Sequence, residues 1–352
     1  MKYDYIVIGA GIAGIIITRL LADKDKQVLI LEKRSHIGGN CYDEYVNGVL
    51  VHRYGPHIFH TDNEKVWKYL NQFTEFNDYK HKVKVSIDDK IYDLPVNYNT
   101  ITNLKYDYRD MNDESLDTIG KLYISENFKG LAKELYNKIY KNYSKKQWGK
   151  YFDSLDESVL NRLSIRYSFN ENYFVDKYQG LPIDGYTRMF ENMLFHKNIE
   201  IELNHKKQSI DIDENNIIYT GMIDELFNYQ YGKLPYRSLD IEFKEYKKEY
   251  YQKYPVINYP NKKRLTRKTE YKYLTKQKCN NTVISKEYPC EYDGINIPYY
   301  PIITNETEEL YNKYESLADK IPNLYLLGRL AEYKYYDMNT VVEKALNLVE
   351  EL

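Results

Sequence analysis

The sequence predicts an α/β fold that begins with a parallel sheet, and three observations lead to this prediction. The apolar run from Tyr3 to Ile8 is typical of a buried parallel strand. Glycines follow it at once, and the apolar stretch Ile15 to Leu21 favours a helix. Val28 to Leu31 has the pattern of a second buried strand. The chain therefore starts as a strand–helix–strand unit.

Later segments predict a hairpin, a helical region and further buried strands. Lys82 to Leu94 roughly alternates between apolar and polar residues, and Asp88-Asp89 stands at its centre like a hairpin turn. Apolar residues from Phe128 to Ile139 follow helical spacing, which favours a small helical insert. Three more elements are expected near the end, namely strands at 217–220 and 324–327 and a helix from about 340 to 350.

Composition excludes several classes of protein. The chain has 352 residues, of which 43% are hydrophobic and 29% charged, as in a soluble globular protein. No apolar run reaches the roughly 20 residues that a membrane span needs. The three cysteines are widely spaced and the N-terminus lacks a signal-peptide pattern, so we expect a cytoplasmic protein. Because the net charge is −2, an anionic substrate must be held by local arginines.

A glycine-rich loop follows the first predicted strand. Gly9-Ala10-Gly11-Ile12-Ala13-Gly14 is a G-x-G-x-x-G that opens the first predicted helix. Its glycines permit a tight turn, close approach of the backbone to a pyrophosphate, and close helix–strand packing. Glu32 ends the second strand, where a carboxylate accepts hydrogen bonds from a ribose hydroxyl. These features predict a Rossmann-type dinucleotide-binding domain.

Two further glycine steps favour FAD over NAD as the dinucleotide. Gly38-Gly39 follows the ribose-binding acid and resembles the extended fingerprint of FAD proteins. Gly328-Arg329 follows a late strand and resembles their C-terminal contact to the same cofactor. Two contact regions so far apart in sequence suit a long cofactor that lies along the domain.

Several short segments together resemble the bacterial UDP-galactopyranose mutases. They occur in that family's order and cover almost the whole chain. These segments are Gly55-Pro56-His57-Ile58-Phe59-His60-Thr61, Tyr143-Ser144-Lys145-Lys146-Gln147-Trp148-Gly149, Asn172-Tyr173-Phe174, Tyr178-Gln179-Gly180, Ile297-Pro298-Tyr299-Tyr300-Pro301 and Gly328-Arg329-Leu330 with Tyr335-Tyr336-Asp337-Met338.

The resemblance implies an isomerase that interconverts UDP-galactopyranose and UDP-galactofuranose, or a close UDP-hexose analogue, for cell-surface glycans. Reduced FAD would form a covalent adduct between flavin N5 and the sugar, with no net redox change. The implied partners are a UDP-sugar substrate, an external electron donor such as NAD(P)H or a flavin reductase, and a second copy of the chain in a homodimer. No nucleic acid and no membrane are expected as partners.

The resemblance also assigns residues to roles. The implied catalytic residues are Arg162, Arg267 and His57. The implied substrate-binding residues are Tyr143, Trp148, Tyr173, Asn258, Tyr300, Tyr335 and Asp337. The implied cofactor-binding residues are Gly9, Gly11, Ala13, Gly14, Glu32, Lys33, Gly38, Gly39, Asn40, His57, Arg329, Asp337 and Met338. Two arginines suit a diphosphate, because each guanidinium can bind phosphate oxygens as a fork.

The same resemblance implies a division of the chain into interleaved domains. The FAD-binding Rossmann-like domain would comprise 1–80, 186–235 and 305–352. A small helical domain with a mobile lid around Arg162 would comprise 96–166. An antiparallel β-sheet substrate domain would comprise 81–95, 167–185 and 236–304. Departures from the family pattern at His81, Ile139 and Leu265 bear on the flavin and uridine contacts.

Two other functions fit part of this pattern. A flavin oxidase of the amine-oxidase class would share the glycine loop and Gly328-Arg329, but not a pair of diphosphate-binding arginines. A non-catalytic FAD- or nucleotide-sugar-binding protein would bind UDP without forming product. Oxygen consumption with an amine would identify the first, and UDP binding without turnover the second.

Two residue patterns have a functional and a structural interpretation. His57 and His60 have a spacing that suits a metal, but no cysteine or carboxylate cluster completes a site nearby, so we expect no metal. Residues 262–278 are dense in Lys and Arg, which suits either a nucleic-acid patch or a solvated strand face. Because no aromatic stacking fingerprint accompanies the positive charges, we favour the solvated face.

Overall fold

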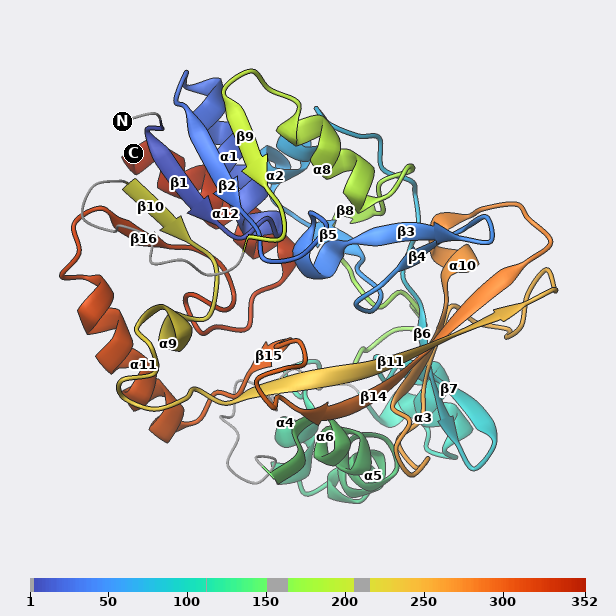
Figure 1. The fold of residues 1–352 in the computed structure, drawn as a ribbon. Coiled ribbons are helices and arrows are strands. Elements are labelled where there is room, and N and C mark those ends of the chain that lie inside the picture. The colour runs from blue at the N-terminus through green and yellow to red at the C-terminus, as the bar shows by residue number, and fades with distance from the viewer. Residues whose placement is uncertain (1–2, 112, 151–163, 206–215) are drawn as a thin grey trace.

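Two large sheets organise the molecule, one parallel and one mostly antiparallel (Figure 1). The computed structural model describes residues 3–111, 113–150, 164–205 and 216–352. In this α/β arrangement both chain termini lie beside the parallel sheet (Figure 1). The α/β class expected from the sequence is therefore confirmed.

The parallel sheet has five strands. Their order is β16 (Leu324–Leu326), β10 (Asn216–Tyr219), β1 (Tyr5–Ile8), β2 (Val28–Leu31) and β9 (Ile199–Glu202), and every neighbouring pair is parallel. The predicted apolar strands are confirmed within a residue or two at their ends. All four residues of β2 are buried, as expected for a strand covered on both faces.

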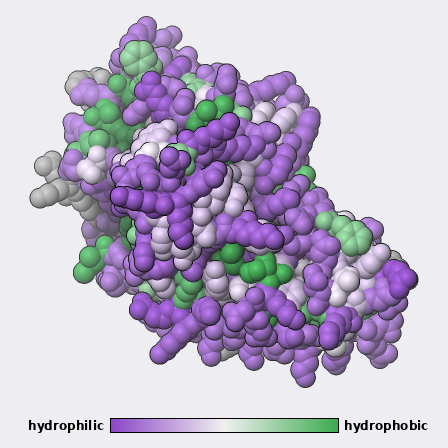
Figure 2. Space-filling model, turned by 90° about the vertical axis from the view of Figure 1, so that its right-hand side faces the viewer, coloured by the Kyte–Doolittle hydropathy of each residue, from purple (hydrophilic) through white to green (hydrophobic). Residues whose placement is uncertain are grey.

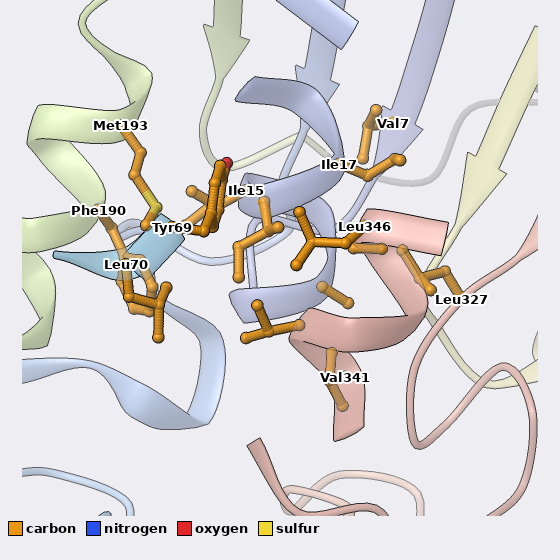
Figure 3. Close-up of a cluster of buried hydrophobic side chains, with 14 of the residues drawn as sticks. Val7, Ile15, Ile17, Tyr69, Leu70, Phe190, Met193, Leu327, Val341 and Leu346 are labelled. Atoms are coloured by element: carbon orange, nitrogen blue, oxygen red, sulfur yellow. The ribbon is translucent and has the colours of Figure 1, made fainter. Parts of the chain in front are cut away.

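Helices pack on this sheet and form the largest hydrophobic core. Helix α1 (Ile12–Asp23) contacts both α8 (Tyr186–Leu194) and α12 (Met338–Glu351), and α2 (Glu64–Leu70) contacts α12. Figure 3 shows Ile15 of α1 between Phe190 of α8 and Leu346 of α12, all of them buried. This core fixes the start of α1, where the glycine loop ends.

The second sheet has seven strands and draws on distant parts of the chain. Their order is β15 (Tyr300–Pro301), β11 (Tyr236–Tyr246), β14 (Thr282–Glu291), β13 (Arg267–Glu270), β12 (Val256–Asn258), β6 (Val83–Ile87) and β7 (Lys90–Leu94). Only the β12–β6 pair is parallel. The predicted hairpin is confirmed as β6–β7, with Asp88 and Asp89 both at positive φ.

A helical layer lies against this second sheet, as the helical spacing predicts. It contains α3 (Tyr98–Asn103), a 3-10 turn η2 (Tyr108–Asp110), α4 (Ile119–Ile124), α5 (Lys129–Leu135), a π-helical turn η3 (Tyr136–Tyr140) and α6 (Lys141–Trp148). Leu131, Leu135 and Ile139 are buried together against strands β6 and β12. The last of these helices, α6, ends at the candidate site.

Smaller elements connect the two sheets. They are η1 (Gly39–Cys41), the hairpin β3 (Asp43–Val46) and β4 (Val49–His52), the pair β5 (Phe59–Thr61) and β8 (Tyr178–Gly180), α9 (Ile223–Leu226), α10 (Tyr271–Thr275) and α11 (Asn305–Ala318). Strand β8 pairs with β5, so part of the segment 167–185 lies beside residues near the N-terminus. The domain boundaries given above remain a proposal.

The interpretation of 262–278 as a solvated strand face is wrong for residues 269–274, which are buried or half-buried. Strand β13 lies inside the sheet between β12 and β14. Glu270 and Lys272 are buried, at 0% and 1% exposure. Glu270 accepts main-chain hydrogen bonds from Tyr251 and Gln252, and Lys272 donates to the carbonyls of Glu249 and Cys279. These buried charges are held by main-chain groups, an environment that charge density alone does not reveal.

The tip of the β3–β4 hairpin lies on one side of the molecule, on the right in Figure 1. Figure 2 shows that side as mainly hydrophilic, with hydrophobic residues in small separate groups. Among the described residues, no helix is long and apolar enough to cross a membrane.

Candidate active site

Arg267 lies at the centre of a row of polar residues that crosses the second sheet. In the register of these strands, Asn258 of β12 pairs with Arg267 of β13, which pairs with Glu287 of β14. Because directly paired residues project from the same face of a sheet, the three side chains lie side by side. Tyr143 of α6 reaches this row from the helical layer.

Each contact of Arg267 fixes the orientation of its guanidinium group. Nε donates to Asn258 Oδ1 at 3.2 Å, and Nη2 donates to the Tyr143 hydroxyl at 3.1 Å. Nη1 lies 3.6 Å from Glu287 Oε2. The side chain keeps 29% of its surface exposed, so the group is oriented but accessible to a ligand. Such a fork binds oxygen anions through two parallel hydrogen bonds.

Glu287 supplies the negative charge beside Arg267. Burial raises the pKa of its carboxyl, and the neighbouring Arg267 guanidinium opposes that rise. Its Oε2 faces Arg267, whereas Oε1 is buried without a hydrogen-bond partner. A carboxylate held in this way offsets part of the charge of Arg267 in the absence of an anionic ligand.

A second group gathers aromatic rings around another guanidinium. Tyr300 stacks on Tyr335 with ring centroids 5.5 Å apart, and Trp148 meets Tyr300 edge-on at 6.4 Å. Arg329 lies 5.5 Å from the centroid of Tyr300 and 5.1 Å from that of Tyr335. Its nitrogens also donate to the carbonyls of Tyr336 and Tyr299.

Tyr300 is influenced by the charges of both groups. Burial raises the pKa of its hydroxyl, while Arg329 and Arg267 both act to lower it. The hydroxyl therefore lies within the field of both guanidiniums. Two cations, several phenol donors and stacked rings in one place suit a ligand that combines phosphate with a flat or cyclic group.

His57 is half-buried, with His52 and the charge of Arg329 nearby. Its Nδ1 lies 2.8 Å from the Gly55 carbonyl, so Nδ1 carries the proton and Nε2 is left as an acceptor. Its main-chain N–H donates to Nδ1 of His52 at 3.0 Å. Burial, with His52 and Arg329 nearby, lowers the pKa of His57 to about 3. The ring is thus a neutral hydrogen-bonding group.

The glycine loop and the Gly38-Gly39 step lie against each other. Gly38 N donates to Ala10 O at 2.7 Å, and a Cβ on Gly39 would lie 2.8 Å from Gly11 Cα. A Cβ on Gly14 would lie 1.9 Å from the Gly9 carbonyl oxygen. Glu32 accepts from the main-chain N–H groups of Ala10 and Arg34. Gly9, Gly11, Gly38 and Gly39 therefore form a side-chain-free cradle at the start of α1.

Two observations of the structure support the fit of this cradle to FAD. One guanidinium nitrogen of Arg34, Nη1, is buried without a partner, while Nη2 donates to Asn40 Oδ1 at 3.0 Å. Gly328, at φ +98°, brings the late chain segment against Ala13 of α1, where an added Cβ would lie 3.1 Å from the Ala13 Cβ. The start of a helix and a guanidinium nitrogen without a partner suit the phosphates of a dinucleotide.

The remaining predicted residues lie at the edges of this arrangement. Tyr173 is 37% exposed and packs edge-on against His81. Met338 contacts Cys41 through sulfur, whereas Asp337 and Lys33 are exposed. Arg162 and the lid expected around it lie outside the described residues. Among the described residues, no group of three or more His, Cys, Asp or Glu could hold a metal ion.

Sequence reasoning missed three residues of this region. They are Glu287, Lys146, which holds the loop between β12 and β13, and Arg237, which binds the end of α6. Lys146 lies within the segment Tyr143 to Gly149, which the sequence analysis had already linked to the site, so this segment could have pointed to it. Glu287 and Arg237 reach the site through strand register, which no local pattern shows.

Two family models match this chain, each over a different part of it. A family model described as UDP-galactopyranose mutase matches residues 138–335, which is more than half of the chain. A model described as an NAD(P)-binding Rossmann-like domain matches residues 7–73. The first match includes Arg267, Tyr143 and Tyr300, and the second includes the glycine loop.

Matches over almost the whole chain were found among both curated proteins and solved structures. The chain is 38% identical to a UDP-galactopyranose mutase of Mycoplasma pneumoniae, over 100% of this chain and 96% of that protein. It is 37% identical to a dTDP-fucopyranose mutase of Escherichia coli, over 98% and 97%. The fold matches the crystal structure of a reduced UDP-galactopyranose mutase with a TM-score of 0.74 and 12% identity, over 99% and 95% of the two chains.

Proposed function

Because the chain belongs to the UDP-galactopyranose mutase family, whose members are isomerases, we propose that it interconverts UDP-galactopyranose and UDP-galactofuranose. The resemblance recognised in the sequence is thereby confirmed as a family relationship. The observation that carries the proposal is the position of Arg267, which Asn258 and Tyr143 orient and which keeps 29% of its side-chain surface exposed.

The proposed work of these residues is to hold a diphosphate and stabilise its leaving charge. Arg267 presents a guanidinium whose direction is already set, so little reorganisation is needed when charge develops on the phosphate. Tyr300 and Tyr335, whose rings stack, would be phenol donors, and Trp148, which meets Tyr300 edge-on, would offer an apolar face to the sugar or base. Arg162 would supply the second guanidinium from outside the described residues.

FAD is the proposed cofactor, held by the cradle of Gly9, Gly11, Gly38 and Gly39 with Glu32 at the ribose. When bound and reduced, it would supply the nucleophile that displaces UDP from the anomeric carbon of the sugar. His57 would meet the cofactor as a neutral acceptor, since its Nδ1 proton faces the Gly55 carbonyl. An electron donor such as NAD(P)H or a flavin reductase, and a homodimeric state, belong to the same proposal.

The proposal is tested by measuring conversion with the cofactor in each redox state. The purified protein should be yellow, and dithionite should be required before it converts UDP-galactofuranose to UDP-galactopyranose in a chromatographic assay. Turnover by the oxidised protein, or a colourless protein that cannot be loaded with FAD, would contradict the proposal. Steady oxygen consumption with an amine would instead identify an oxidase.

The relative from Escherichia coli gives a second candidate substrate. That protein is named a dTDP-fucopyranose mutase and is almost as similar to this chain as the UDP-galactopyranose mutases are. The same assay should therefore be run with dTDP-fucopyranose. A kcat/KM that is higher for the dTDP sugar would move the assignment to a 6-deoxyhexose while leaving the reaction type unchanged.

A further inference from the structure

The ammonium group of Lys146 is held by three main-chain carbonyls. Its Nζ donates to Tyr259 O at 2.6 Å, Leu265 O at 2.6 Å and Lys262 O at 2.9 Å. An ammonium group has three donors and no acceptor, so these three carbonyls use all of its hydrogen-bonding capacity. Lys146 is half-buried, and its ammonium group is held by the carbonyls of one loop rather than by a surface carboxylate.

Partial burial of a charged ammonium group costs free energy, because the group loses part of its hydration. Burial lowers the pKa of Lys146 to about 8, which means that the surroundings disfavour its charge. A buried cation is tolerated where fixed dipoles replace its water. The carbonyls do this, and the position in the last turn of α6 adds the favourable end of the helix dipole.

The loop that binds Lys146 joins β12 and β13, the two strands that carry Asn258 and Arg267. Strand β12 ends at Asn258, and strand β13 begins at Arg267. Between them, Tyr259 N donates to Thr266 O at 2.8 Å, so the loop closes as a continuation of the β12–β13 ladder. Movement of this loop would therefore displace both ends at once.

The helix that carries Lys146 also carries Tyr143, which binds Arg267. Residues three apart lie on the same side of a helix, so the two side chains approach the sheet together. From the other side, Arg237 Nε donates to Gln147 O at 2.7 Å and Nη2 to Lys146 O at 3.1 Å. The last turn of α6 is thus fixed to β11 by its carbonyls and to the β12–β13 loop by Lys146.

We propose that Lys146 is a positioning residue for the diphosphate site, because it sets the loop between β12 and β13 relative to α6 and thereby sets Arg267 relative to Tyr143. The inference rests on the proposed function only in taking Arg267 as a ligand of the diphosphate. All three donors of Lys146 bind carbonyls, so none is left for a substrate.

Replacement of Lys146 by methionine tests this role. Methionine replaces the apolar part of the lysine side chain, lacks its ammonium group, and leaves three carbonyls without their charged donor. Hydrogen bonds of charged groups are worth enough that we expect Kd for UDP to rise about 10-fold in the FAD-loaded protein. The same replacement at the neighbouring exposed Lys145 is the matched control, and its Kd should stay at the wild-type value. Lys146→Arg keeps the charge and should recover part of the affinity.

A double-mutant cycle distinguishes positioning from general stability. If Lys146 acts through Arg267, Lys146→Met should change Kd for UDP by less than about 2-fold once Arg267→Ala is present. An equal fold-change in both backgrounds would overturn the proposal, because the effect would then not pass through Arg267. If Lys146→Met does not fold, the cycle is run with Lys146→Arg, whose partial effect must vanish in the same way.

The single variants separate failure of this inference from failure of the proposed function. An unchanged Kd for Lys146→Met, with a raised Kd for Arg267→Ala, would overturn the positioning role and leave the diphosphate site intact. An unchanged Kd for Arg267→Ala would overturn both. The expected result is a raised Kd for each single variant and little further change in the double variant.

Discussion

At the scale of single residues, the site depends on a guanidinium whose direction is fixed before any ligand binds. Asn258 and Tyr143 each accept one hydrogen bond from Arg267, and Glu287 lies beside its third nitrogen. Fixed donors stabilise developing charge better than water does, because they need not reorient during the reaction. The geometry of the group is therefore as important as its charge.

Replacing Arg267 by lysine separates charge from geometry. Lysine keeps the positive charge but loses the planar fork and the bond to Asn258, so we expect kcat/KM to fall roughly 10²-fold or more. The measurement is conversion of the UDP-sugar by the reduced protein. Lys263→Ala, an exposed change in the adjoining loop, should leave kcat/KM within about 2-fold of wild type. Near-normal turnover by Arg267→Lys would show that a point charge suffices.

A methyl group at Gly39 tests the cofactor cradle. Gly39 has φ +55°, and an added Cβ would lie 2.8 Å from Gly11 Cα. Backbone has to move to relieve that contact, so Gly39→Ala should purify with little flavin. The ratio of flavin to protein absorbance measures this directly. Ser35→Ala, in the same connection but exposed, should bind flavin as wild type does. Full flavin content in Gly39→Ala would contradict the proposed position of the cofactor.

At the scale of elements, the end of α6 is where helical layer and second sheet are joined. The helix stops at Gly149, whose φ of +59° and ψ of −129° only glycine adopts easily. The guanidinium of Arg237 fills the space beside it. The end of α6, which carries Trp148, therefore meets Arg237 of strand β11 at Gly149.

Alanine at Gly149 should destabilise this junction. Its Cβ would lie 2.9 Å from Arg237 Nη1, in addition to the backbone strain, so a loss of about 1–3 kcal/mol in the free energy of unfolding is expected. Urea titration followed by circular dichroism measures it. Gly130→Ala is the matched control, because Gly130 lies in α5 with nothing within 4 Å of its added Cβ. Equal stability of the two variants would show that the junction tolerates a side chain.

The sequence predicted the helices and strands of this protein more completely than the side-chain contacts between them. Apolar runs predicted β1, β2 and β10, and paired aspartates predicted the β6–β7 turn, since these signals are local. The row from Asn258 to Glu287 could not be predicted in the same way. It depends on strand register between distant segments, and a shift of one residue would turn each side chain to the other face. Arg267 was found through family motifs, and Glu287 was not found at all.

At the scale of the whole molecule, the site is assembled from segments that are far apart in the chain. The glycine loop comes from the first 40 residues, α6 from the helical layer, Arg267 from the second sheet and Arg329 from the end of the parallel sheet. Each segment alone would be an ordinary turn, helix or strand. Folding of the whole chain therefore creates the site, and global unfolding should remove it in one step.

The last prediction concerns acid sensitivity of the folded molecule. His52 and His81 are buried, at 1% and 5% exposure, and burial lowers the pKa of each to about 3. In the unfolded chain a histidine takes up its proton near pH 6.5. Between those values the unfolded state binds more protons, so the free energy of unfolding falls as pH falls below 6.5. Each histidine should remove about 1 kcal/mol of stability by pH 5.5.

Urea unfolding at pH 7.5 and pH 5.5 tests this, with FAD concentration fixed because a bound cofactor adds stability by mass action. The buried carboxyls of Asp43 and Glu287 have raised pKa values and contribute with the opposite sign, so the test compares wild type with a variant that lacks one histidine. His81→Asn removes one titrating ring while keeping a hydrogen-bonding side chain beside the Tyr79 hydroxyl. The difference in stability between the two pH values should therefore shrink by about 1 kcal/mol in that variant. An undiminished difference would mean that His81 is protonated in the folded protein and that its charge is balanced inside the site.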